Sequence, residues 1–456
     1  MSEKKHSEIN PARTQLLCDD ADLLRSANVW RSLHHPCKHR ANPILKPDRP
    51  WEGYLVLQPG KVIYDREAGC FRMWYNSQPS RDKPDAGQNL CYATSIDGVH
   101  WQKPELGLIE HKGTTANNIL LQGVSWSHCL LKEEAECSED KRYKLLYWMG
   151  GGNTKTPGIY AAFSADGIHW TSCGDEPVVP KWATGDTFSG MRDPASGLYW
   201  LYHKTPSEPI RTVSRMVSDD FLQWKESCRV LAPDAVDPPD TQFYGLSAFP
   251  YAAQHLGILW VYHTYDQTMD MQLVSSRDGL HWDRTADRKL FMHLVPTNNY
   301  TGKAFDSTMI YPASSPVTWD GRLWLFYSGF TVPHNARSAD HDGCVGVATT
   351  RLDGFCSRDA ASPREIFTRP FVWQGARLCL NAAVYGKPGA IRVEIRDANR
   401  NPLPGFTMEQ CTPFRGDETE AVMDWAGRSD LSNLTGRTVH LRFELNYARL
   451  YAWRTE

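Results

Sequence analysis

A short motif recurs along the chain with almost the same residues each time. It reads Ser-Ile-Asp-Gly-Val-His-Trp at 95–101, Ser-Ala-Asp-Gly-Ile-His-Trp at 164–170 and Ser-Arg-Asp-Gly-Leu-His-Trp at 276–282. Its apolar residues do not follow a helical period. Asp-Gly is typical of a tight turn, because Asp accepts local backbone hydrogen bonds and Gly adopts positive φ. The motif therefore indicates one architectural unit that is used several times.

Each copy follows two runs that are rich in aromatic and β-branched residues, which is typical of strands. Two weaker copies fill the remaining intervals, so five units can be traced. Five such units predict an all-β fold, a five-bladed β-propeller of four-stranded blades. The motif is then the turn between the third and outer strands, with its aromatic residue toward the rim. These aromatic residues are Trp101, Trp170, Trp224, Trp282 and Phe355.

The pattern changes near residue 366, where apolar and polar residues begin to alternate between Asn- and Gly-containing turns. This alternation predicts a C-terminal β-sandwich over 366–456, after a propeller over 51–365. Residues 1–50 form an N-terminal segment that packs on the propeller or closes it. Within this segment, Gln-Leu-Leu-Cys-Asp-Asp (15–20) is the candidate closing strand.

Net charge and composition exclude some classes of function and favour others. The 456 residues carry a formal net charge of −3, which argues against nucleic-acid and membrane-surface partners. No apolar leader or run of about 18 apolar residues is present. Twelve Cys without a Cys-x-x-Cys pair indicate reduced thiols and a cytoplasmic protein. The 17 Trp and 19 Tyr suit both strands and sugar-stacking surfaces. The oligomeric state stays open.

One cluster of potential metal ligands is present, Leu-His-His-Pro-Cys-Lys-His at 33–39. A tetrahedral zinc site needs four convergent ligands, and no second cluster with ligand spacing accompanies this one. We therefore expect no metal and no cofactor.

The five units, their Trp-Tyr strands, the Ser-x-Asp-Gly-x-x-Trp turns and the C-terminal sandwich together resemble the five-bladed propeller glycoside hydrolases of families 32, 43, 62 and 68. The order of domains is most similar to bacterial proteins of the family-32 N-terminal-domain-like group. The resemblance covers nearly the whole chain. It implies a propeller fold and a carbohydrate substrate, while the reaction depends on the site.

The catalytic motifs of family 32 are not reproduced. The chain has neither Asn-Asp-Pro-Asn-Gly nor the family's Glu-Cys near the third blade, although it has Arg-Asp-Pro at 192–194. This Arg-Asp-Pro directly precedes a Trp-Tyr strand. We therefore predict that Asp193 lies in the hairpin turn between the first and second strands of the third blade, away from the catalytic acids.

The acids that precede the innermost strands are the catalytic candidates, because those strands begin around the propeller axis. Carboxylates gathered there would suit a two-carboxylate glycosidase. Glu52 is the expected general acid and Asp186 the expected base or nucleophile, with Asp240 and Asp306 tuning charge or holding sugar hydroxyls. Each of the four acids could instead be a loop carboxylate that caps a turn.

Other polar and aromatic residues near these strand starts are candidate substrate-binding groups, although blade packing is the alternative for each aromatic one. They are Trp51, His128, Trp182, Tyr244, His334 and Arg337.

The sequence thus predicts a glycoside hydrolase that acts on a small glycoside, with furanosides among the expected classes. Two alternatives stay open, a phosphorylase or transglycosylase on the same fold and a non-catalytic carbohydrate-binding propeller. A phosphorylase would need a basic phosphate site, for which Arg192, Lys303 and Arg337 are the sequence candidates.

Overall fold

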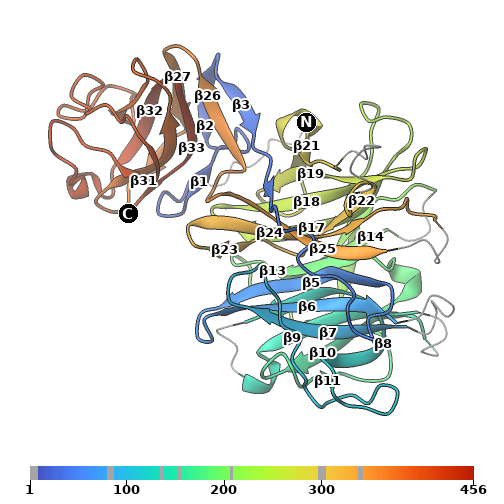
Figure 1. Ribbon diagram of the computed structural model, residues 1–456. Coiled ribbons are helices and arrows are strands. Elements are labelled where there is room, and N and C mark those ends of the chain that lie inside the picture. The colour runs from blue at the N-terminus through green and yellow to red at the C-terminus, as the bar shows by residue number, and fades with distance from the viewer. Residues whose placement is uncertain are drawn as a thin grey trace.

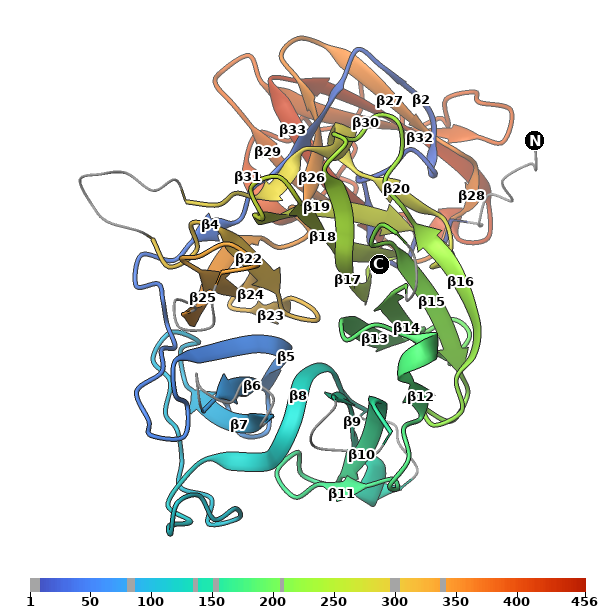
Figure 2. The same ribbon diagram turned by 90° about the vertical axis from the view of Figure 1, so that its right-hand side faces the viewer.

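The computed structural model describes residues 9–79, 87–133, 138–150, 156–205, 209–295, 304–336 and 342–456, with the side chains of 58, 59, 126–128 and 226 excepted. The described residues form strands joined by turns and a few single-turn 3₁₀ helices. None of the helices in these ranges has the length and apolar character needed to cross a membrane. Figure 1 shows the strands gathered into two bodies, and Figure 2 views the larger body with its sheets around a common centre.

The larger body is a β-propeller, as predicted. Its first two blades share one long strand, because the start of β8 pairs with β7 and its end pairs with β9. The strands of blades one and two are β5 (Leu55–Asp65), β6 (Cys70–Gln78), β7 (Gln88–Ser95), β8 (Ile119–Lys132), β9 (Tyr143–Met149), β10 (Gly158–Ser164), β11 (Thr171–Ser172) and β12 (Val179–Pro180).

Three further antiparallel meanders follow, so the strand pairings of the described residues divide the propeller into five units. Blade three contains β13 (Phe188–Arg192), β14 (Tyr199–Lys204), β15 (Val213–Ser218) and β16 (Lys225–Leu231). Blade four contains β17 (Thr241–Tyr251), β18 (Gln254–His263), β19 (Met269–Ser276), β20 (Trp282–Arg284) and β21 (Leu290–Met292). Blade five contains β22 (Met309–Pro312), β23 (Val317–Trp319), β24 (Arg322–Phe330) and β25 (Gly343–Arg351).

The repeated motif forms the predicted turn. In its first copy, Asp97 accepts backbone hydrogen bonds from Val99 and His100 at 2.9 and 2.8 Å, and the His100 ring binds the same carboxylate. Gly98 adopts φ of 72°, and the copies at Asp166 and Asp278 repeat the arrangement. Asp and His therefore recur because they hydrogen-bond to each other and to the turn backbone, and Gly recurs because its position requires positive φ.

The same turn also joins neighbouring blades, which the sequence did not predict. A Cβ on Gly167 would lie 2.8 Å from Trp74 of blade one, and Trp74 donates a 2.7 Å hydrogen bond to the Gly167 carbonyl. A Cβ on Gly279 would lie even closer to Trp200 of blade three, at 2.2 Å. The Trp-Tyr strands are thus partners of the turn in the following blade, and glycine is needed because any side chain would collide with the indole.

The N-terminal segment contributes strands to both domains. β4 (Cys37–Lys38) pairs with β25 as the outer strand of blade five, and Leu45 bridges to Val345. The expected closing strand over 15–20 instead contributes β1 (Gln15–Leu16) to the sandwich, where it pairs with β33. Because β4 has only two residues, it carries no alternating pattern by which the sequence could reveal it.

The sandwich has two sheets and draws strands from both ends of the chain. One sheet contains β3 (Trp30–Leu33), β26 (Cys356–Ala360), β33 (Ala448–Thr455), β29 (Leu378–Val384) and β31 (Asp417–Val422), with β1 beside β33. The other contains β2 (Leu23–Ala27), β27 (Arg364–Thr368), β32 (Thr438–Asn446), β28 (Phe371–Val372) and β30 (Ala390–Asp397). The pairings therefore place the sandwich at 15–33 and from 356, rather than from 366 alone.

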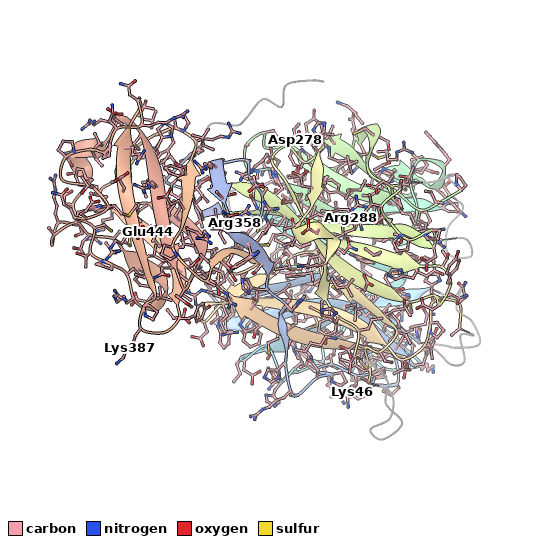
Figure 3. The ribbon with its side chains drawn as sticks, turned by 90° about the horizontal axis from the view of Figure 1, so that it is seen from above. Lys46, Asp278, Arg288, Arg358, Lys387 and Glu444 are labelled. Atoms are coloured by element: carbon pink, nitrogen blue, oxygen red, sulfur yellow. The ribbon has the colours of Figure 1, made fainter. Side chains whose placement is uncertain are left out.

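Two short connectors link the domains. One is the three-residue step from β3 to β4, the other the four-residue step from β25 to β26, and they run side by side where His34 N donates to Phe355 O at 2.9 Å. Ion pairs lie beside this junction. Arg358, which Figure 3 places between the two bodies, binds Asp20 within the sandwich. Arg277, in the motif of blade four, binds Asp19 and Asp22 at 3.0 and 2.9 Å.

Replacing Arg277 by Ala is expected to lower the free energy of unfolding by about 2 kcal/mol, because two largely buried carboxylates lose their partner. Burial already raises the pKa of Asp22, and Arg277 opposes that rise. Urea unfolding at pH 7 measures the loss. Arg322→Ala, at an exposed hairpin of blade five, is the control, and an equal effect in both variants would contradict the assignment.

Candidate functional site

One end of the propeller axis brings three of the sequence candidates, Asp186, Tyr244 and His334, together with two further residues. In an antiparallel meander the start of the first strand, the end of the second and the start of the third lie at the same end. Asp186 precedes β13, Lys204 ends β14 and Arg211 precedes β15, so blade three brings these three residues together. We call the group formed by Asp186, Lys204, Arg211, Tyr244 and His334 the axial polar cluster.

Asp186 is the accessible acid of this cluster. Its side chain is 42% exposed and forms an ion pair with Lys204, whose ammonium also lies 4.8 Å from the centre of the Tyr244 ring. A cation in direct contact favours the ionised form of a carboxylate. Asp186 therefore combines a cationic partner with access to solvent.

Tyr244 contacts three other members of the cluster, Lys204, Arg211 and His334. The guanidinium of Arg211 is 5.3 Å from its ring centre, and His334 Nε2 is 2.9 Å from its hydroxyl oxygen. Burial raises the pKa of Tyr244, and the negative charge of Asp186 adds to this rise. The phenol is consequently neutral at physiological pH, so Tyr244 acts here as a hydrogen-bonding and stacking group.

The cluster has an excess of positive charge among the described residues. Asp186 pairs with Lys204, whereas Arg211 donates to the neutral amide of Gln242 at 2.6 Å and forms no ion pair with any residue in the described ranges. One carboxylate thus faces two cations. Neither Lys204 nor Arg211 was predicted as a site residue from the sequence. The position of Lys204 could have indicated it, because Lys204 ends the Trp-Tyr strand of blade three, at the same end of the axis as Asp186.

Glu52 lies away from this cluster and is wholly buried. Tyr75 donates to its Oε1 at 2.6 Å, Lys103 reaches Oε1 at 2.7 Å and Oε2 at 2.8 Å, and the backbone amides of Asp48 and Arg49 donate to Oε2. Both oxygens are occupied and neither reaches solvent. This geometry does not support the expected role of general acid.

Asp306 is also buried, with 1% of its surface exposed. Lys38 donates to its Oδ2 at 2.6 Å and Tyr327 donates to the same oxygen at 2.9 Å. Since Lys38 belongs to β4, this ion pair fastens the closing strand to blade five. Asp306 therefore has a structural contact in place of the expected contact with substrate.

Asp240 begins blade four at the same end of the axis but faces a histidine. Its Oδ2 is 3.9 Å from His263 Nδ1, and His263 Nε2 is 2.9 Å from Asp270 Oδ2. The hydrogen bond to Asp270 raises the pKa of His263, and the charge of Asp240 adds to the effect. Each of the four predicted acids thus has its own cationic or histidine neighbour, and among them Asp186 has the most exposed side chain.

Asp193 lies where it was predicted, in the turn between β13 and β14 at the opposite end of blade three from Asp186. Its carboxylate accepts hydrogen bonds from the amide and hydroxyl of Ser196 at 2.8 and 2.6 Å and contacts His255 Nε2 at 3.0 Å. These contacts lower the pKa of Asp193, although burial opposes them. Arg-Asp-Pro at 192–194 therefore matches the catalytic motif in sequence but lies in a turn, at the other end of the blade from Asp186.

Of the remaining candidates that the structure describes, Trp51 is buried and Trp182 is exposed to solvent. Trp51 is buried and donates to Asn118 at 2.7 Å, which fits blade packing. Trp182 lies in a 3₁₀ turn (Lys181–Ala183) four residues before Asp186 and is 80% exposed, so its indole is available for stacking. The side chain of His128, together with Arg337 and Lys303, lies outside the described residues.

The histidine-rich segment at 33–39 does not converge on one point. His34 contacts the Ser357 hydroxyl at 2.7 Å, while the His35 ring packs on His293 with centroids 4.6 Å apart. Among the residues described, no three His, Cys, Asp or Glu side chains are arranged to hold a metal ion.

No family model matches the sequence, and no curated protein matches it. Solved structures with a similar chain path include a glycosyl hydrolase from Bacteroides ovatus, 15% identical over 70% of this chain and 94% of that one, with a TM-score of 0.48. Another comes from work on the GH130 family of mannoside phosphorylases, 15% identical over 72% and 96% of the two chains, TM-score 0.46. A third is named simply as a glycoside hydrolase, 14% identical over 71% and 93%, TM-score 0.47. At these identities, function has to be inferred from the side chains around the axis.

Proposed function

We propose that this chain is a carbohydrate-active enzyme that cleaves a glycosidic bond at the axial polar cluster. The observation that carries the proposal is Asp186, an ionised and solvent-accessible carboxylate at the start of an innermost propeller strand. Its side chain is 42% exposed, against 0%, 2% and 11% for Glu52, Asp306 and Asp240. The resemblance to propeller glycoside hydrolases supports a glycoside as substrate.

In this mechanism Asp186 is the base that activates water or the nucleophile that attacks the sugar. Both roles require the charged carboxylate, and the contact with Lys204 favours that form. The exposed indole of Trp182 supplies a face for the apolar side of a sugar ring. Tyr244 and His334, joined by their 2.9 Å contact, offer hydrogen bonds to sugar hydroxyls.

Phosphorolysis is the second candidate, and the excess positive charge favours it. Lys204 and Arg211 both lie against the Tyr244 ring, so one phosphate could contact both. Phosphate would then be the nucleophile. By taking over the Lys204 contact, its negative charge would raise the pKa of Asp186 and allow that residue to protonate the leaving oxygen. A single carboxylate is sufficient for this reaction.

A panel of nitrophenyl furanosides and pyranosides, assayed with and without phosphate, tests both reactions. Hydrolysis predicts nitrophenol and free sugar at a rate that does not depend on phosphate. Phosphorolysis predicts a phosphate-dependent rate and a sugar phosphate as product. If no glycoside is cleaved under either condition while glycans still bind, the chain is a carbohydrate-binding propeller.

Replacing Arg211 by Met is expected to raise the half-saturating phosphate concentration at least about 10-fold, because a charge-assisted contact of roughly 1.4 kcal/mol or more is lost. Initial rates over a phosphate series measure the change. Arg215→Met is the matched control, since Arg215 lies in the same blade but stacks on Trp200, 4.7 Å from its ring centre. Equal phosphate saturation in all three proteins would rule out Arg211 as a phosphate ligand.

A further inference from the structure

An interior lysine lies at the propeller axis, apart from the axial polar cluster. Lys61 belongs to β5, the innermost strand of blade one, and its ammonium donates a hydrogen bond to the hydroxyl of Ser315 just beyond β22 of blade five. It is also in electrostatic contact with Cys129 of β8, the innermost strand of blade two. Residues from three blades therefore meet around this one ammonium group.

Lys61 has no anionic partner in the described part of the chain. No carboxylate oxygen of these residues lies within 4.0 Å of its ammonium, in contrast to Lys38, Lys103 and Lys144, each of which pairs with an acid. A buried charge is costly unless it is paired and hydrogen-bonded. The ammonium at the axis thus lacks the compensation that the other interior lysines have.

A second observation points to the same place. The Ser314 hydroxyl is buried, with 4% of the residue exposed, and has no hydrogen-bond partner among the described residues. Its backbone amide donates to the Gly60 carbonyl at 3.3 Å, which places Ser314 directly beside Lys61. Buried polar groups in folded proteins nearly always have a partner, so an unsatisfied hydroxyl next to an unpaired ammonium indicates a missing acceptor.

The acceptor has to be small. The blades pack tightly here, since a Cβ on Gly190 of blade three would lie only 2.5 Å from Cys129 Sγ. Lys61 is only partly buried, so solvent reaches part of this residue. We propose that the propeller axis holds a monovalent inorganic anion, chloride, bound by the Lys61 ammonium and the hydroxyls of Ser314 and Ser315.

The anion would stabilise the fold by compensating the buried charge and by joining blades one and five at the axis. Burial lowers the pKa of Lys61 to about 8, and Cys129, whose pKa burial raises to about 12, is neutral over the same range. The lysine is therefore cationic below about pH 8, where its buried charge destabilises the fold, and it loses that charge as pH rises. Stabilisation by chloride is expected to be complete at acidic and neutral pH and to fade above about pH 8.

The test uses the whole chain, unfolded by heat in sodium chloride or in sodium gluconate at equal ionic strength. Chloride is expected to raise Tm in a saturable manner by about 2 °C at pH 6.5, and by less at pH 9.5. Lys61→Met is expected to have the same Tm in both salts. Lys387→Met, on the sandwich far from the propeller in Figure 3, is expected to behave like wild type.

Crystals soaked in bromide provide a direct readout, because bromide can replace chloride and scatters anomalously. A peak beside Lys61 that is absent in Lys61→Met supports the site. Equal Tm values for wild type in chloride and gluconate, a chloride effect that persists in Lys61→Met, or no bromide peak at the axis would each overturn the proposal.

Discussion

Replacement of Asp186 by Asn is expected to reduce kcat/KM by about 10³-fold for both a natural glycoside and an activated aryl glycoside. An amide can neither attack the sugar nor accept a proton from water, so a better leaving group does not restore the rate. The fold should survive, because an ion pair between partly exposed groups contributes only about 0–1 kcal/mol. Initial rates on both substrates and the unfolding temperature measure these effects.

Asp193→Asn is the matched control for this experiment, since it alters an Asp of the same blade at the opposite end of β13. Asp193 contacts Ser196 and His255 in a turn, so its replacement should affect stability and leave kcat/KM unchanged. Loss of turnover in Asp193→Asn with full activity in Asp186→Asn would show that the family-32 motif functions here after all.

Replacement of Glu52 by Gln is expected to lower the free energy of unfolding by about 3–5 kcal/mol, with little change in the kcat of the folded protein. Lys103, whose side chain is 3% exposed, would keep a buried charge without its partner. The Gln amide has one acceptor oxygen, so either the backbone amides of Asp48 and Arg49 or the Tyr75 hydroxyl would lose its acceptor. Urea unfolding measures the loss.

The double variant Glu52→Gln, Lys103→Met should regain part of this stability, because it also removes the unpaired charge. If Glu52→Gln were instead as stable as wild type but inactive, Glu52 would be the general acid that its position in the sequence first indicated.

The sequence was a good guide to local structure. The motif at 95–101 and its copies predicted turns correctly, because Asp, Gly and His meet within seven residues. The closing strand could not be found in this way, since two residues of β4 pair with Ala348 and Thr349 more than 300 positions away. The N-terminal strands of the sandwich were missed for the same reason, as Gln15 pairs with Trp453.

Prediction of the candidate acids from the sequence was limited in a similar way. Their spacing from the hairpin turns predicts only which end of a strand they approach, because spacing does not say where a side chain points. Glu52 and Asp306 are neutralised by Lys103 and Lys38, which lie 51 and 268 positions away in the sequence. Asp186 pairs with Lys204 of the adjacent strand, 18 positions away, and this ion pair leaves it accessible.

The two connectors between propeller and sandwich restrict how the domains can move. A single linker would permit a hinge, but here His34 and Phe355 join two antiparallel connectors by a hydrogen bond, and Arg277 of the propeller binds Asp19 and Asp22 of the sandwich segment. Rotation about one connector would strain the other. The paired connectors therefore oppose a hinge motion of the sandwich against the propeller.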